Sequence, residues 1–125
     1  LVDVTGFGLM GHLYEMASGS NVEVEIYAGK VPFMTGTLEY GSMGLIPGGA
    51  YTNREYLENK FECEKNVDDT LRDLLFSPET AGGLLISVAE GKADQLQEEM
   101  KNRGCQCVMI GRVVKEDFRP IKIKR

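Results

Sequence analysis

The sequence contains no continuous apolar run that approaches the roughly 18 to 20 residues of a membrane-spanning helix, so it does not predict a membrane-embedded protein. It also lacks an excess of basic residues: 14 Lys and Arg stand against 19 Asp and Glu, and the net charge is −5. General nucleic-acid binding depends on Lys and Arg that neutralise phosphates, so an acidic domain is a poor candidate for that class. With 42% hydrophobic and 26% charged residues over 125 positions, the composition predicts a single globular domain.

Cysteine and histidine are too few for a zinc site. The cysteines are Cys63, Cys105 and Cys107, and His12 is the only histidine. A structural zinc ion needs four ligands at recurring short spacings, which a C-x-C pair and one distant histidine do not provide. This number and spacing of cysteines predict reduced, structural thiols in a cytoplasmic protein.

Hydrophobic periodicity predicts helices and strands in irregular alternation. Apolar spacings of three and four residues predict helices at about 7–18, 67–76 and 91–103, and a further short helix is expected at 35–41. Alternation or short apolar runs predict strands at 22–27, 84–89, 106–114 and 118–124. Residues 41–53 are rich in Gly and Pro and are expected to form a loop. Together these segments predict an α+β fold with helices packed on a mixed β-sheet.

The strand patterns also predict which side chains are buried. In V-E-V-E-I-Y, residues 22–27, the apolar side chains are expected to face the core, and Glu23 and Glu25 the solvent. The continuous apolar run of residues 84–89 predicts a buried strand. In the strand expected at 118–124, Ile121 and Ile123 alternate with Lys122 and Lys124, which is typical of an edge strand that is protected from mispairing.

Glycine is abundant, at 15 residues, and much of it lies in three loops. These loops are D-V-T-G-F-G at residues 3–8, P-G-G at 47–49 and T-A-G-G at 80–83. Thr5 stands where a helix N-cap is expected, and Phe7 on the apolar face of the helix that follows. Glycines let a phosphate approach a helix N-terminus, and a preceding carboxylate such as Asp3 can hold a Mg²⁺ that bridges phosphate oxygens.

Each glycine loop has a plainer interpretation as a turn that only caps a helix. Three such loops in one small acidic domain nevertheless favour a shared anionic ligand. The first loop is not a Walker A motif, because no Gly-Lys-Ser/Thr follows, and no acidic strand end supports a dinucleotide site. His12 can act as a structural hydrogen-bonding group, as a donor to phosphate or as an acid–base group. No Ser-His-Asp, Cys-His or paired-carboxylate arrangement is evident.

Three stretches carry a resemblance to a known family. In chain order they read D-V-T-G-F-G-L-M-G-H-L, I-P-G-G-A-Y-T-N and S-P-E-T-A-G-G-L-L-I-S-V. Over residues 1 to about 114 the chain resembles the C-terminal half of the selenophosphate synthetase (selenide, water dikinase) family. The most specific stretch is T-G-F-G-L-x-G-H, because relatives in the aminoimidazole ribonucleotide synthetase superfamily, such as thiamine-monophosphate kinase, usually lack the Gly-His pair.

The resemblance implies an activity and a set of partners. ATP, selenide and water would give selenophosphate, AMP and phosphate, with Mg²⁺ as the cofactor. Residues 1–125 would form a single C-terminal domain of a longer chain, and the nucleotide would lie between this domain and an N-terminal ATP-binding, catalytic domain. The start at Leu1-Val2-Asp3, without an initiator Met or a signal-peptide pattern, agrees with an internal position. The complete enzyme is expected to be a cytoplasmic homodimer.

The resemblance also implies roles for individual residues. Asp3 matches a metal-binding aspartate, and Thr5, Gly6 and Gly8 match the nucleotide-site turn beside it. Three further matching residues have no assigned role: Asn53, Gly82 and Gly83. Many family members read D-P-Q-T-S-G-G where this chain reads S-P-E-T-A-G-G, which argues against a direct polar role for the side chains of that loop.

No catalytic residue is expected within this chain. The reactive Cys or selenocysteine of the family, its adjacent Lys and its glycine-rich segment are not among these 125 residues, and none of the three cysteines matches that position. The isolated chain is therefore expected to be inactive. Two alternatives remain at this point: another ATP-dependent small-molecule kinase of the same superfamily, which would release ADP, and a domain that serves only for packing.

Overall fold

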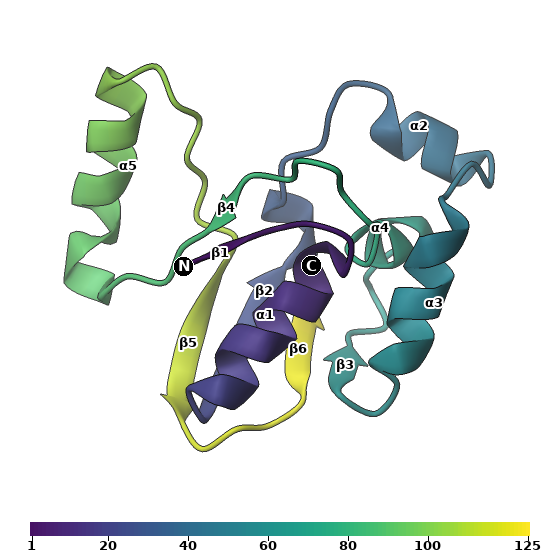
Figure 1. The fold of residues 1–125 in the computed structure, drawn as a ribbon, viewed down its shortest axis with the longest axis horizontal. Coiled ribbons are helices and arrows are strands. Elements are labelled where there is room, and N and C mark those ends of the chain that lie inside the picture. The colour runs from purple at the N-terminus through teal and green to yellow at the C-terminus, as the bar shows by residue number, and fades with distance from the viewer.

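The main β-sheet has four strands in the order β3–β6–β2–β5 (Figure 1). The computed structural model describes residues 1–125. The strands are β1 (Val2–Asp3), β2 (Val22–Tyr27), β3 (Phe61–Cys63), β4 (Leu84–Leu85), β5 (Gly111–Glu116) and β6 (Ile121–Lys124). The helices are α1 (Gly8–Gly19), α2 (Thr37–Ser42), α3 (Gly48–Tyr56), α4 (Asp69–Leu74) and α5 (Ala93–Asn102), with single 3-10 turns at Ala28–Lys30 and Glu90–Lys92.

The sheet is mixed, as the sequence predicted. β2 is antiparallel to β5 and parallel to β6, and β6 is parallel to β3. β1 and β4 form a separate, antiparallel pair of two residues each. Figure 1 shows α1 lying across β2 and β6, with α2, α3 and α4 grouped on one side and α5 on the other. This arrangement confirms the α+β class.

The hydrophobic core lies between α1 and the sheet. Met10 and Ala17 of α1 pack there with Ile26 of β2 and with Ile121 and Ile123 of β6, and all five side chains are almost fully buried. Complete burial of a side chain of the size of Ile or Met is worth about 1.5–3 kcal/mol. The three- and four-residue spacing along α1 thus identified the helix face that stabilises the domain.

The start of α1 differs from the prediction. Phe7, rather than Thr5, is the N-cap residue, and it makes no side-chain capping bond. The Thr5 hydroxyl instead contacts Nε2 of His12 at 3.1 Å. Phe7 is 53% exposed and does not join the buried face, because the chain turns through a left-handed Gly8 (φ +71°) before the helix proceeds.

The expectation that Glu23 and Glu25 face solvent is wrong, since their residues are only 3% and 6% exposed. Cationic side chains of the neighbouring strands cover them. The pairs are Lys122–Glu23 at 2.7 Å, Lys115–Glu23 at 3.2 Å, Lys124–Glu25 at 2.8 Å and Arg112–Glu25 at 3.0 Å. The prediction of an edge strand at 118–124 is also wrong, because β6 lies between β3 and β2 in the sheet. In this inner position the β6 lysines reach the β2 glutamates.

These ion pairs predict a loss of stability in acid. The hydrogen bond from Lys122 holds the pKa of Glu23 below its ordinary value of 4.5, and Lys124 does the same for Glu25. A carboxylate whose pKa is lowered by folding contributes stability above its unfolded pKa, and that contribution disappears as the pH falls through its folded pKa. We expect the urea midpoint of Glu23→Gln to fall less steeply below pH 4.5 than that of the wild type.

The matched control for this prediction is Glu58→Gln, because Glu58 is exposed and belongs to none of the ion pairs. It should keep the pH dependence of the wild type. Equal acid slopes for wild type and Glu23→Gln would contradict the prediction.

Three further segments differ from the sequence-based expectations. The expected loop 41–53 contains the start of α3, which follows Pro47 and buries Ala50. The helix predicted at 67–76 is shorter, and Asp68 caps it by accepting a hydrogen bond from the Leu71 amide at 3.1 Å. The strand predicted at 106–114 occupies Gly111–Glu116. The short helix expected at 35–41 is confirmed as α2.

The buried strand predicted at 84–89 is wrong. β4 has only two residues because its partner β1 offers no more, and Leu84 is 57% exposed. The predicted helix at 91–103 is confirmed as α5, which Gly104 ends with a φ of +74°, but α5 has no buried residue and stands away from the main sheet (Figure 1). Apolar side chains are consequently exposed around β4 and β5: Leu84, Ile86, Val88, Val108, Met109, Val113 and Val114. No helix of the structure has the length and apolar character to cross a bilayer.

Candidate functional site

The glycine turn between β1 and α1 lies against the loop that precedes β4. The Val4 amide donates to the Gly83 carbonyl at 2.9 Å, and the Gly82 amide returns a hydrogen bond to the Val4 carbonyl at 3.0 Å. The Glu79 amide donates to the Thr5 carbonyl at 3.1 Å. All three bonds use backbone atoms, so they hold the segment in place without hydrogen bonds from its side chains. That the side chains of S-P-E-T-A-G-G have no direct polar role toward a ligand stays a prediction.

Two glycines of these loops are required by close backbone approach. A Cβ on Gly8 would lie 2.7 Å from the Phe76 carbonyl oxygen, and Gly8 also has a positive φ. A Cβ on Gly82 would lie 2.8 Å from the Val4 carbonyl oxygen. Gly6 is different, because a Cβ there would meet nothing within 4 Å. The protein itself therefore leaves open space at Gly6, on the exposed side of the turn.

Asn53 connects the turn to two other parts of the chain. Its Nδ2 donates to the Gly6 carbonyl and to the Phe76 carbonyl, both at 2.9 Å. The sequence pattern assigned no role to Asn53, and the two hydrogen bonds show that its side chain holds the turn in place. The Pro-Gly-Gly loop also lies close to the S-P-E-T-A-G-G segment that contains the third loop, since a Cβ on Gly49 would lie 3.0 Å from a side-chain carbon of Pro78. All three glycine motifs thus meet in one region.

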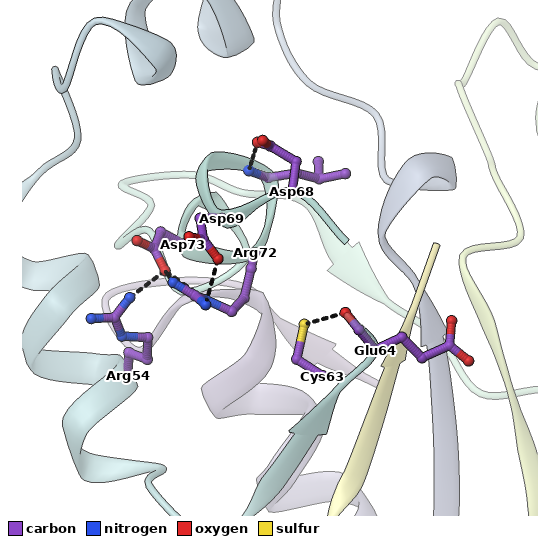
Figure 2. Close-up of polar contacts among 8 residues, drawn as sticks. Arg54, Cys63, Glu64, Asp68, Asp69, Arg72 and Asp73 are labelled. Carbon is purple, nitrogen blue, oxygen red and sulfur yellow. Dashed lines mark hydrogen bonds and ion pairs between the residues drawn. The ribbon is translucent and has the colours of Figure 1, made fainter. Parts of the chain in front are cut away.

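An ion-pair network holds α3, and with it Asn53, against α4 (Figure 2). Asp73 of α4 is mostly buried, and its Oδ1 accepts from Arg54 of α3 and from Nε and Nη2 of Arg72, the latter both at 2.9 Å. Burial opposes the charge of Arg72, but the hydrogen bond to Asp73 and the attraction of the Asp73 and Asp69 carboxylates together outweigh it, so the pKa of Arg72 is raised. The Asp73 carboxylate therefore links α3 to α4 through Arg54.

The three cysteines are free thiols, and Cys105 among them is exposed. Burial raises the pKa of Cys63, which keeps its thiol protonated. The Cys63 thiol lies 3.6 Å from the Glu64 carbonyl (Figure 2). A protonated thiol is a poor nucleophile, so Cys63 is a structural residue.

Asp3 and Thr5 occupy the exposed side of the turn, and Val4 between them is buried. Alternate residues of an extended segment lie on the same face, so Asp3 and Thr5 share the exposed face of this segment, while the Thr5 hydroxyl contacts His12. No group of three or more His, Cys, Asp or Glu gathers here or elsewhere in the chain. Mg²⁺ commonly uses only one or two protein carboxylates and takes its other ligands from water and phosphate, so a lone exposed carboxylate fits such an ion. The assignment of a metal ion to Asp3 remains a prediction.

A small cavity beside the turn is too small for a nucleotide. Its volume is about 50 Å³, and its lining includes Phe7, Gly11 and Asn53. Sites for drug-sized ligands are commonly about 300–1,000 Å³. Beside the turn, the chain therefore presents an open surface rather than an enclosed pocket of ligand size.

The chain is similar in sequence to proteins of a known family. The profile of the family described as "AIR synthase related protein, C-terminal domain" matches residues 1–122. The chain belongs to this family. Members of the AIR synthase related family that are similar to it include proteins named "Selenide, water dikinase" from Clostridium botulinum (strain Eklund 17B), Caldanaerobacter subterraneus and Pelobacter propionicus.

These similarities are strong over the whole domain. The chain is 44% identical to the Clostridium protein over 122 residues, which is 98% of this chain and 35% of the relative. Identity is 47% over 112 residues for the Caldanaerobacter protein, covering 89% of this chain and 32% of the relative. For the Pelobacter protein it is 45% over 123 residues, or 98% and 35%. The resemblance seen in the sequence motifs is confirmed, and the chain spans about a third of the length of these relatives.

Proposed function

We propose that this chain is the C-terminal domain of a selenide, water dikinase, which converts ATP, selenide and water to selenophosphate, AMP and phosphate. The observation that carries the proposal is the 44% identity to a protein of that name over 98% of this chain. The convergence of the three glycine motifs on one exposed turn supports it. The enzyme would be a cytoplasmic homodimer, and an N-terminal domain would supply the rest of the nucleotide site.

In this proposal Asp3 contributes one carboxylate to Mg²⁺ on the ATP phosphates. Bound Mg²⁺ would neutralise the negative charge that develops on the phosphate leaving groups. The Thr5–Gly8 turn contributes a shape: Gly6 leaves room for a ligand, while Gly8 lets the turn lie against the backbone of Phe76 and Ser77, just after α4. Asn53 and the backbone of residues 79–83 hold that shape before a ligand arrives, which avoids an ordering cost on binding.

The proposed reaction is tested by phosphorus NMR on the full-length protein with Mg-ATP, with and without selenide. We expect a new phosphorus resonance that requires selenide, together with AMP. ADP, or a product that is independent of selenide, would instead assign the protein to a kinase of the same superfamily. The chain of residues 1–125 alone serves as a control and should give no turnover, because one carboxylate and one open wall do not make a complete site.

A further inference from the structure

His12 is a buried polar side chain that the proposed roles of Asp3 and the glycine turn leave unused. Its side chain is 9% exposed and lies in the first turns of α1. Nε2 lies 3.1 Å from the Thr5 hydroxyl, and Nδ1 lies 3.1 Å from a carboxylate oxygen of Glu15. The Phe7 ring meets the imidazole edge to face, with ring centroids 5.9 Å apart. Both ring nitrogens are therefore engaged, and the orientation of the imidazole is fixed from two sides.

The Glu15 carboxylate determines where the imidazole proton lies. A carboxylate only accepts hydrogen bonds, so Nδ1 must carry the proton that it donates to Glu15. In the neutral imidazole, Nε2 is then an acceptor, and its partner Thr5 must donate. The only proton of the Thr5 hydroxyl is used in this bond. The remaining lone pairs of Thr5 Oγ1 are free to accept.

An acceptor on the face shared with Asp3 selects between possible ligands. A phosphate oxygen is itself an acceptor and gains nothing from a hydroxyl whose proton is already used. A divalent cation, or a water molecule bound to it, interacts favourably with a hydroxyl lone pair and with a carboxylate. The Asp3–Thr5 face is therefore suited to the hydrated metal of a metal–nucleotide complex, and poorly suited to a bare phosphate group.

We propose that His12, oriented by Glu15, is a positioning residue that makes the Thr5 hydroxyl an acceptor beside Asp3, so that this face binds hydrated Mg²⁺ rather than phosphate. The inference rests on the proposed function for the identity of the metal–nucleotide ligand. It assigns a role to the histidine of the T-G-F-G-L-x-G-H stretch that the sequence alone left open among three possibilities.

The first test is metal binding, which does not depend on turnover. Titration calorimetry on the full-length protein with saturating ATP gives the Mg²⁺ concentration at half-saturation. Loss of a partner that orients a metal ligand typically lowers metal affinity 10–100-fold. Thr5 is exposed, and Val has nearly the same shape, so Thr5→Val should fold. We expect Thr5→Val to raise the Mg²⁺ concentration at half-saturation about tenfold, and Thr5→Ser, which keeps the hydroxyl, to have the wild-type value. Metal-free ATP should bind Thr5→Val as well as it binds the wild type. An unchanged Mg²⁺ requirement in Thr5→Val would overturn the proposal.

The second test separates positioning from simple packing at His12. Nitrogen-15 NMR of histidine-labelled full-length protein, with the His12 signal assigned from its loss in His12→Phe, should show the tautomer with the proton on Nδ1. Glu15→Ala changes an exposed side chain, so it should fold, abolish that preference and raise the Mg²⁺ requirement. The proposal fails if the proton lies on Nε2 in the wild type, or if Glu15→Ala leaves both the tautomer and the Mg²⁺ requirement unchanged.

The two proposals fail separately. A Mg²⁺ requirement that depends on Thr5, without selenide-dependent AMP formation, would retain the role of His12 and remove the dikinase assignment. Selenide-dependent AMP formation with a Thr5→Val variant that binds Mg²⁺ normally would do the reverse.

Discussion

Replacement of Asp3 by Asn in the full-length protein is expected to reduce selenide-dependent ATP turnover by roughly 10²–10³-fold, the usual cost of removing one group that stabilises developing charge. Asn keeps the size and a carbonyl oxygen but removes the negative charge that would hold Mg²⁺. The fold should be unaffected, because Asp3 is exposed and joins β1 through its backbone alone. Turnover is measured as AMP release at saturating Mg-ATP and selenide.

The matched control for Asp3→Asn is Glu79→Gln. Glu79 is also an exposed carboxylate on the neighbouring loop, and its backbone amide, rather than its side chain, bonds to Thr5. Glu79→Gln should retain turnover close to that of the wild type. Near-normal activity of Asp3→Asn would remove Asp3 from the metal site, and a large loss in Glu79→Gln would show that general charge around the turn is what matters.

Gly8→Ala is expected to destabilise the domain by about 3 kcal/mol, through two effects that add. A left-handed backbone costs a residue with a side chain roughly 1–2 kcal/mol, and forcing a methyl group into a closely packed site typically costs another 1–3 kcal/mol. Gly8 has a φ of +71°, and its Cβ would lie 2.7 Å from the rigid carbonyl oxygen of Phe76. In a domain of this size the melting temperature should fall by about 10 °C.

Gly44→Ala isolates the first of these effects. Gly44 has a similar φ of +83°, but a Cβ there would meet nothing within 4 Å. It should cost only the roughly 1–2 kcal/mol of backbone strain. Both variants are compared with the wild type by thermal unfolding followed by circular dichroism. Equal destabilisation of the two variants would mean that the contact between Gly8 and the end of α4 relaxes without cost.

Local patterns were sufficient where the forces are local. The limits of α1 and β2 could be predicted to within about a residue, because helix and strand periodicity depend on near neighbours. The burial of Glu23 could not, since its partner Lys122 lies 99 positions further along the chain. The inner position of β6 in the sheet could not be predicted either, because its partner β2 is equally far away in the sequence. Alternation of Ile and Lys describes equally well an edge strand and an inner strand whose lysines meet carboxylates.

In the candidate site, too, the residues of a contiguous motif could be predicted and those that act through distant contacts could not. Asp3, Thr5, Gly6 and Gly8 were found because they form one contiguous motif. Asn53 was not given a role, because the backbone carbonyls that it bonds belong to residues 47 positions earlier and 23 positions later. A single Asn after Pro-Gly-Gly carries no local signal of such bonds. Only the fold brings α3, the turn and the end of α4 together.

The central place of β6 bears on how the chain folds as it is synthesised. β2 is synthesised before its parallel partner β6, which begins only at Ile121, and pairing across such a separation is intrinsically slow. At roughly 5–20 residues per second, β2 is without that partner for about 5–20 s. During this time V-E-V-E-I-Y is an unpaired strand that other nascent chains could join. Glu23 and Glu25 then act as gatekeepers, since their repulsion discourages association until the lysines of β6 arrive and neutralise them.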